Sequence, residues 1–397
     1  MKSHFTLKDL IRLAGKKGDP MGSAEACIYF DGRIAAAANS HATLEIDCPQ
    51  PLAEPILLSV KDLKIAQAAA PELALSMEDG RLRANGVRVP HLVADDVMPE
   101  QTQALLHLAR DAWRLIAKPF RLDGTRWKQI LPAMPDGDIR HYLNGAYLDL
   151  ATGAIVGLNG RQMHLVEDAL PPQPMPPEHL PGVIVPTAVI RALAAVGGVQ
   201  EAFVLQKKPV PGAPAAPSGS TQLPERVICF AVANAKYRTY TIAAGEYPQY
   251  RAIFERNKGY PVSLLLDAHA TRALRTVARV AKCNPNYQGV HIEGEGRGIK
   301  VAHLDLISQT IQLAVPLAQA FEVMVHAGSL LDALDAAASF GVAVSMRYSL
   351  EEGQGIYVGA QDFHAIVAPM RGPDEDDSES AMDAQQQGDK PLATAGT

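Results

Sequence analysis

The run HLVED (164–168) carries the residue types of an acid–base or metal site. A histidine beside carboxylates, here His164 with Glu167 and Asp168, can serve as a general base or bind a metal ion. The run is typical of a strand end, however, where alternation sends neighbouring side chains to opposite faces of a sheet. No further ligand cluster or nucleophile motif accompanies it. A hydrolase built on these residues is therefore the weaker interpretation, and the sequence predicts a protein without catalytic activity, cofactor or bound metal.

Other catalytic and nucleotide-binding patterns are missing from the sequence. It has no Walker-type loop, no GxSxG and no HExxH motif. The glycine-rich run GEGRG (294–298) is not followed by a helical pattern, so it predicts a hairpin turn and not a phosphate-binding loop. The four cysteines show no CxxC spacing and the first residues lack a secretory signal, which together predict a reduced, cytoplasmic protein.

The densest cationic pattern lies in ATRALRTVARVAK (270–282). In a helix its four cations, Arg272, Arg275, Arg279 and Lys282, fall within an arc of about 80°, opposite an apolar face. No acid follows Asp267 in this segment, so no acidic side chain of the same helix neutralises the face. An ordinary solvated face is the alternative interpretation.

Weaker cationic sets recur in other predicted helices, although the 397-residue chain has 43 acidic against 37 basic side chains and a formal charge of -6. Cations that gather on helix faces of an acidic chain favour contact with a phosphate backbone. No aromatic residues alternate with them to stack bases, which favours non-sequence-specific contact with duplex DNA. The further candidate DNA-binding residues of these helices are Arg12, Lys16, Lys17, Lys61, Lys64 and Arg126.

An internal repeat supplies the elements that would position these residues. The segments 24–49, 143–171 and 287–315 each predict a strand, a turn, a second strand and a third alternating strand, and each follows a short amphipathic helix. Each is followed by a second set in which a strand leads into a helix and a meander. This order predicts an α+β fold of three repeated domains, each with two helices packed on antiparallel sheets, and excludes a doubly wound α/β fold.

The repeats place domain boundaries at 1–117, 118–255 and 256–372. Residues 373–397 lack hydrophobic periodicity and are acidic, which predicts a disordered tail. The proline-rich segment 207–225 lies between two strand patterns and predicts a long hairpin loop. Residues 100–119 predict an additional helix between the first two domains.

Five motifs along this repeat are similar to those of one family: RHYLNG (140–145), LNGRQMHL (158–165), VIVPTAVIRAL (183–193), EYPQYRAIF (246–254) and FHAIVAPMRG (363–372). In this order and spacing they resemble the bacterial sliding clamp, the β subunit of DNA polymerase III, across residues 1 to 372. The resemblance implies a processivity factor, a head-to-tail homodimeric ring whose helices surround duplex DNA. It also implies two protein partners, the catalytic subunit of the polymerase and the clamp loader, at the nucleoid in the cytoplasm.

The resemblance also assigns two sets of residues. Arg140, His141 and Tyr142 would lie near the face of the ring and contact DNA, although Tyr142 could equally pack within the meander. A hydrophobic peptide pocket between the second and third domains would be lined by Leu143, Met163, Pro248, Ile253, Ile366, Val367, Pro369, Met370 and Arg371. Ordinary core packing is the alternative for each of these nine residues taken alone.

The sequence departs from the family pattern beside this pocket. Arg161 and Gln162 stand where a His-Arg pair is usual, Ala368 replaces a methionine, and the chain continues past Arg371 into the acidic tail. These departures indicate a divergent member of the family. A clamp-like scaffold that binds proteins without encircling DNA is the rival interpretation.

Overall fold

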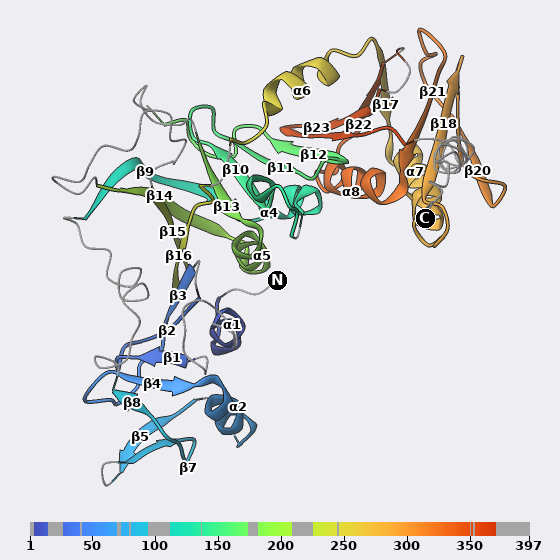
Figure 1. Ribbon diagram of the computed structural model, residues 1–397. Helices are drawn as coiled ribbons and strands as arrows, with labels where there is room; N and C mark the ends of the chain where they lie inside the picture. Colours follow the sequence, from blue (N-terminus) through green and yellow to red (C-terminus); the bar gives the residue numbers. More distant parts are fainter. Residues whose placement is uncertain are drawn as a thin grey trace, which may run out of the picture. The chain divides into compact units, whose positions relative to one another are not determined.

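The computed structural model describes residues 4–14, 27–39, 42–69, 73–78, 81–93, 112–135, 137–173, 182–208, 225–243, 246–349, 351 and 354–370. The chain divides into two compact units. Figure 1 labels their helices and strands. Unit 1 comprises Met1–Gly157 and Glu167–Tyr247, and unit 2 comprises Leu158–Val166 and Pro248–Thr397. Each unit has helices packed on antiparallel sheets, which confirms the predicted α+β class. None of the described helices is long and apolar enough to span a membrane.

A nine-stranded sheet forms the larger part of unit 1, in the order β8-β4-β1-β2-β3-β16-β15-β14-β9. Strand β3 pairs with β16 from a distant part of the sequence, with Glu45 opposite Lys236, so the ladder joins the first sequence repeat to the second. The strands of this sheet are β1 (Cys27–Phe30), β2 (Ile34–Ala38), β3 (Ala42–Asp47), β4 (Ile56–Ser59), β8 (Leu92–Val93), β9 (Trp113–Asp123), β14 (Val199–Lys207), β15 (Arg226–Val232) and β16 (Ala235–Tyr240).

Two smaller groups of strands complete unit 1. Strand β10 (Gly145–Asp149) pairs with β11 (Ala154–Leu158) and β13 (Gly182–Pro186). Strands β5 (Leu75–Glu78), β6 (Arg81–Ala84) and β7 (Val87–Arg88) form a separate meander.

Four α-helices of unit 1 fall where the repeat predicts them: α1 (Leu7–Leu13), α2 (Val60–Ala69), α4 (Trp127–Ile130) and α5 (Thr187–Val196). Helix α1 begins at Thr6, whose backbone N–H donates to Asp9 at 2.9 Å, a capping contact that satisfies a helix N-terminus. Helix α5 follows Pro186 directly and ends at Gly197, where φ is +66°. It buries Val189, Ile190 and Leu193.

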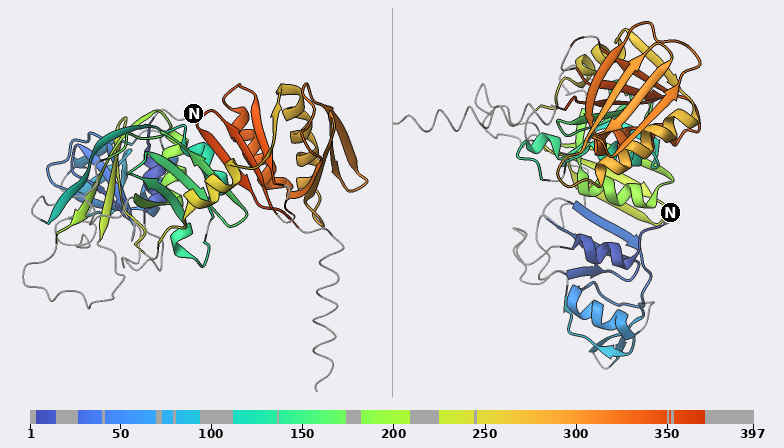
Figure 2. Two further views of the ribbon diagram at one scale, coloured as in Figure 1. Left: turned by 90° about the horizontal axis from the view of Figure 1, so that it is seen from above. Right: turned by 90° about the vertical axis from the view of Figure 1, so that its right-hand side faces the viewer.

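Unit 2 shows the predicted plan of two long helices on two sheets (Figure 2). Helix α7 (Ala268–Lys282) packs on α8 (Ala327–Ala338), and each covers one sheet. The first sheet has the order β20-β19-β18-β21, with β18 (Gly289–Glu295), β19 (Gly298–His303), β20 (Ile307–Gln312) and β21 (Phe321–His326). In the second, β12 (Gln162–Val166), β24 (Phe363–Val367), β23 (Ile356–Ala360), β22 (Val344–Tyr348) and β17 (Val262–Leu266) pair in succession.

The periodicity of α7 explains why it forms and how it packs. Asp267 caps its first turn by accepting from the N–H of Ala270 at 2.7 Å. Leu274, Val277 and Ala281 are fully buried, and the cations lie on the opposite side as the sequence predicts. A further helix, α6 (Tyr250–Lys258), precedes β17.

The helix predicted over residues 100–119 is wrong for Trp113–Pro119, which belong to strand β9. Trp113, Ala117 and Phe120 are buried in the ladder with β14, so pairing with a distant strand outweighs the local helical pattern. The register slips between Ala202 and Val204, and the resulting bulge accommodates Pro119, which cannot donate to the ladder. Residues 94–111 lie outside the described part of the chain.

The structure confirms two predicted hairpins, one whose strands lead into the proline-rich loop and one closed by the glycine-rich turn. Strands β14 and β15 pair up to Gln206 and Arg226, and an ion pair of 2.8 Å joins Lys207 to Glu225 at the mouth of the proline-rich loop. The glycine-rich run closes a turn between Glu295 and Gly298. Residues 209–224 of the loop and the predicted tail lie outside the described residues.

Candidate nucleic-acid and peptide-binding surfaces

The cationic face of α7 is accessible in the structure of unit 2. Arg272, Arg279 and Lys282 are exposed, opposite the buried apolar side of the helix. Arg275 is different, because it forms an ion pair with Asp335 of the neighbouring helix α8. As the sequence predicts, no acid of α7 itself neutralises this face, yet Arg275 is paired. The acid comes from another helix, which the sequence of α7 alone does not reveal.

A polar cluster lies at the C-terminal end of α7. His326 caps α8, where its Nδ1 accepts from the N–H of Ser329 at 3.3 Å. Burial lowers the pKa of His326, and the charges of Arg161 and Lys282 lower it further. Burial also raises the pKa of Asp332, whose carboxylate accepts a 3.5 Å bond from Gln162. The cluster therefore favours neutral His326 beside the cations of this face.

The remaining helix cations lie in unit 1. Lys61 and Lys64 are exposed on α2. Arg12 is exposed on α1, and its guanidinium is 3.8 Å from Asp9, a surface ion pair of little energetic weight. Arg126 is half-buried at the start of α4, 3.5 Å from the side-chain oxygen of Gln129. Lys16 and Lys17 lie outside the described residues.

The predicted DNA contact around Arg140 contains an acid that sequence reasoning missed. Asp138 accepts two bonds from the Arg140 guanidinium, at 3.0 Å from Nε and 2.7 Å from Nη2. These bonds lower the pKa of Asp138 to about 2. His141 is exposed and Tyr142 is half-buried. Arg140 is therefore a paired cation, and the signal was available because Asp138 precedes it by two residues.

The residues predicted to line the peptide pocket differ in accessibility. In unit 2, Met163 of β12 lies opposite Ile366 of β24, and both are buried, as is Val367. Pro248 and Ile253, before and within α6, are half-buried. Pro369 is exposed and Met370 is half-buried, Leu143 is buried within unit 1, and Arg371 lies outside the described residues.

Backbone bonds hold the C-terminal segment of unit 2 in place. The N–H of Ala368 donates to Arg161, and that of Met370 to Met324, each at 2.8 Å. The loop that carries Arg161 is itself closed by Asn159, whose side chain accepts from two following N–H groups at 3.0 Å. The departures from the clamp pattern at Arg161 and Ala368 are thus direct neighbours in space.

The alternative hydrolase site gains no support from the geometry. His164 has no exposed surface, and its ring packs edge-on against Phe363 with 5.3 Å between centroids. A side chain without exposed surface cannot reach a substrate. Glu167 and Asp168 follow in the turn after β12.

Comparisons with solved structures identify the fold. No protein-family model matches the chain, and no curated protein is significantly similar to it in sequence. The Helicobacter pylori β clamp bound to a DNA ligase peptide matches with a TM-score of 0.66 and 14% identity, over 92% of this chain and 96% of that chain. The Pseudomonas aeruginosa DNA polymerase sliding clamp matches with a TM-score of 0.65, 17% identity and the same coverage. The β subunit from the DNA polymerase of Streptococcus pyogenes matches with a TM-score of 0.63 and 14% identity, again over 92% of this chain and 96% of that chain.

The chain therefore has the fold of the bacterial DNA polymerase sliding clamps. The resemblance seen in the motifs is confirmed at the level of the fold, at an identity that fits a divergent sequence.

Proposed function

We propose that this protein is a divergent sliding clamp, a processivity factor that encircles duplex DNA as a head-to-tail ring of two copies. The observation that carries the proposal is the extent of the structural match. The match to the Helicobacter pylori β clamp spans 92% of this chain and 96% of the clamp chain. On this proposal the protein has no catalytic activity of its own. It would act at the nucleoid, with the polymerase catalytic subunit and the clamp loader as partners.

The proposed ring follows from the repeat. We assign three clamp domains to residues 1–117, 118–255 and 256–372, each with one pair of helices: α1 with α2, α4 with α5, and α7 with α8. Strand β9 crosses the first of these boundaries and α6 the second, so the connections are themselves ordered elements. Two copies would place twelve such helices around the DNA, and closure would leave fewer free sheet edges.

The exposed cations of α7 are the best candidates for contact with the DNA backbone. Replacing Arg272 and Arg279 together by glutamine removes two cations without touching the apolar side of the helix. We expect less polymerase processivity on a primed nicked circle, and weaker DNA binding with a smaller dependence on salt, by about 0.9 in the log–log slope for each lost phosphate contact. The readouts are product length and affinity as a function of salt concentration.

A matched control is Arg297→Gln, which removes an exposed cation from the β18–β19 turn of the same unit. It should leave processivity and the salt dependence unchanged. Equal processivity and equal salt slope in the α7 double variant and the wild type would contradict the DNA-contact assignment.

The second part of the proposal is a site for short hydrophobic peptides near Pro248, Ile253, Pro369 and Met370, the accessible members of the predicted pocket. The Helicobacter pylori clamp was solved with a DNA ligase peptide, which supports a peptide-binding role for this fold. Deleting residues 369–397 should abolish binding of a fluorescent peptide that carries the hydrophobic polymerase motif. Deleting only residues 373–397 should preserve it. Equal binding by the two truncated chains would reject this assignment.

A clamp-like scaffold that does not encircle DNA is the second candidate. The ion pairs of Arg275 with Asp335 and of Arg140 with Asp138 favour it, because they remove two of the predicted DNA-facing cations. The mass of the protein in solution separates the two candidates, since the ring needs two chains of 42.5 kDa and the scaffold needs only one.

A further inference from the structure

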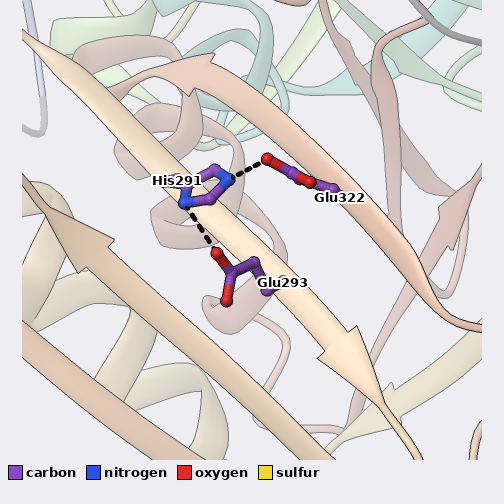
Figure 3. Close-up of side chains that lie close together, drawn as sticks. All are labelled: His291, Glu293 and Glu322. Carbon is purple, nitrogen blue, oxygen red and sulfur yellow. Dashed lines mark hydrogen bonds and ion pairs between the residues drawn. The ribbon is translucent and has the colours of Figure 1, made fainter.

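Three potential metal ligands meet on the sheet of unit 2 that α7 covers (Figure 3). His291 and Glu293 are two residues apart on β18 and therefore point to the same face. Glu322 lies on the adjacent strand β21, directly opposite Glu293 in the ladder. Nε2 of His291 is 2.7 Å from Oε1 of Glu322, and Nδ1 of the same ring is 3.3 Å from Oε1 of Glu293.

This arrangement brings two like charges together. Carboxylates directly opposite each other in an antiparallel ladder are destabilising unless a cation lies between or beside them. Lys300 approaches Glu293 from the other side, at 3.5 Å, and Glu295 adds a third carboxylate to the same face. Three carboxylates thus face one ammonium group, and His291 is the group placed between the two opposed acids.

The donor set indicates what cation would fit. One ligand atom from each of His291, Glu293 and Glu322 lies within 4.8 Å of the other two. An imidazole nitrogen with two carboxylate oxygens is a set that zinc and similar first-row metals accept, whereas magnesium and calcium prefer oxygen alone. The carboxylates also border a surface hollow of about 620 Å³, lined further by Lys300, Thr310 and Phe321.

We propose that His291, Glu293 and Glu322 form a binding site for a divalent first-row transition metal, Zn²⁺ being the probe of choice. His291 and Glu293 alternate with buried Val290 and Ile292, so they lie on the face of β18 opposite its buried side. A metal there joins β18 to β21 without involving the cations of α7. The inference stands apart from the proposed clamp function and would hold for the scaffold as well.

Isothermal titration of the metal-free, full-length protein with zinc chloride tests the site. We expect one zinc per chain, lost or weakened by at least about tenfold in His291→Ala and in Glu322→Gln. Glu295→Gln is the matched control, because it removes a carboxylate from the same strand and face but not from the ligand set. It should bind zinc as the wild type does.

Two further measurements keep the result unambiguous. Cys283→Ser removes an exposed thiol that could bind zinc by itself, and it should leave the stoichiometric site intact. Magnesium chloride should bind far more weakly than zinc, because the imidazole is a poor ligand for it. Absence of stoichiometric zinc binding, unchanged affinity in His291→Ala, loss of binding in Cys283→Ser, or equal affinity for magnesium would each overturn the proposal.

Discussion

Glu45 on β3 is the clearest case in which a single side chain ties two sequence repeats together. It is buried, with bonds of 2.9 Å to Lys236 and 3.0 Å to Arg238 on β16. Burial alone would raise the pKa of Glu45, but the hydrogen bonds and charges of Lys236 and Arg238 outweigh burial and lower it. The ionised carboxylate therefore stabilises the folded sheet.

This pairing predicts how stability depends on pH. Because the pKa of Glu45 is lower in the folded chain than in the unfolded chain, its contribution is complete above the ordinary carboxyl range and is lost as the pH falls through the folded value. Glu45→Gln should cost about 2 kcal/mol at neutral pH, the range for hydrogen bonds to a charged group. The difference from the wild type should shrink toward acid pH, measured by urea unfolding between neutral and acid pH.

The exposed Glu54 supplies the control for this prediction. Glu54→Gln should leave the free energy of unfolding unchanged across the same pH range. A difference for Glu45→Gln that is absent at neutral pH, or that grows toward acid, would contradict the role assigned to Glu45.

At the residue scale, the sequence predicts which side chains are cationic but not which are paired. The sequence shows that no acid of the same helix pairs with Arg275, but it does not reveal Asp335, which lies 60 positions away on another helix. The buried members of the predicted pocket, such as Met163 and Val367, show the same limit, since alternation in a strand does not say which face is covered. Local motifs determine residue type and spacing, whereas pairing and burial depend on the assembled fold.

At the element scale, hydrophobic periodicity predicts a helix correctly where one face of that helix is covered. It predicts the wrong element where pairing with a distant strand determines the conformation. Helix α7 follows from its amphipathic pattern and from Asp267 as its cap. Strand β9 does not follow from its local pattern. That pattern is typical of a helix, but the segment pairs with β14, about 80 positions further along the chain. The hairpin turns were predictable because glycine and proline mark them in the sequence.

The packing of β18 on β21 makes a prediction for one glycine. A Cβ at Gly294 would collide with the ring of Phe321, directly opposite on β21. That ring cannot easily retreat, because it stacks on Tyr348 with 3.7 Å between centroids. Gly294→Ala should therefore destabilise the protein by about 1–3 kcal/mol, as overpacking does.

The neighbouring Gly298 is the control, because a Cβ there would meet its nearest atom, the carbonyl oxygen of Glu295, at an ordinary 3.6 Å. Gly298→Ala should shift the urea midpoint much less than Gly294→Ala. Equal midpoints for the two variants would show that Phe321 moves aside, and would contradict tight packing between Gly294 and Phe321.

At the scale of the whole molecule, an acidic chain is compatible with a DNA-encircling function. The proposed ring would hold DNA by its closed shape and would need few attractive contacts, and a net charge of -6 would limit non-specific binding elsewhere on its surface. The resemblance of the five motifs to the sliding clamps, together with the repeat, implies the clamp fold, which the structural matches over 92% of the chain confirm. The assembly of two copies follows from the proposal and is open to direct observation.

Electron microscopy of the purified full-length protein tests the proposed ring most directly, because it needs neither a polymerase nor a clamp loader. We expect class averages of a closed ring of two chains with a central hole, at a solution mass twice that of the 42.5 kDa chain. Single chains, or dimers without a central hole, would contradict the proposed ring.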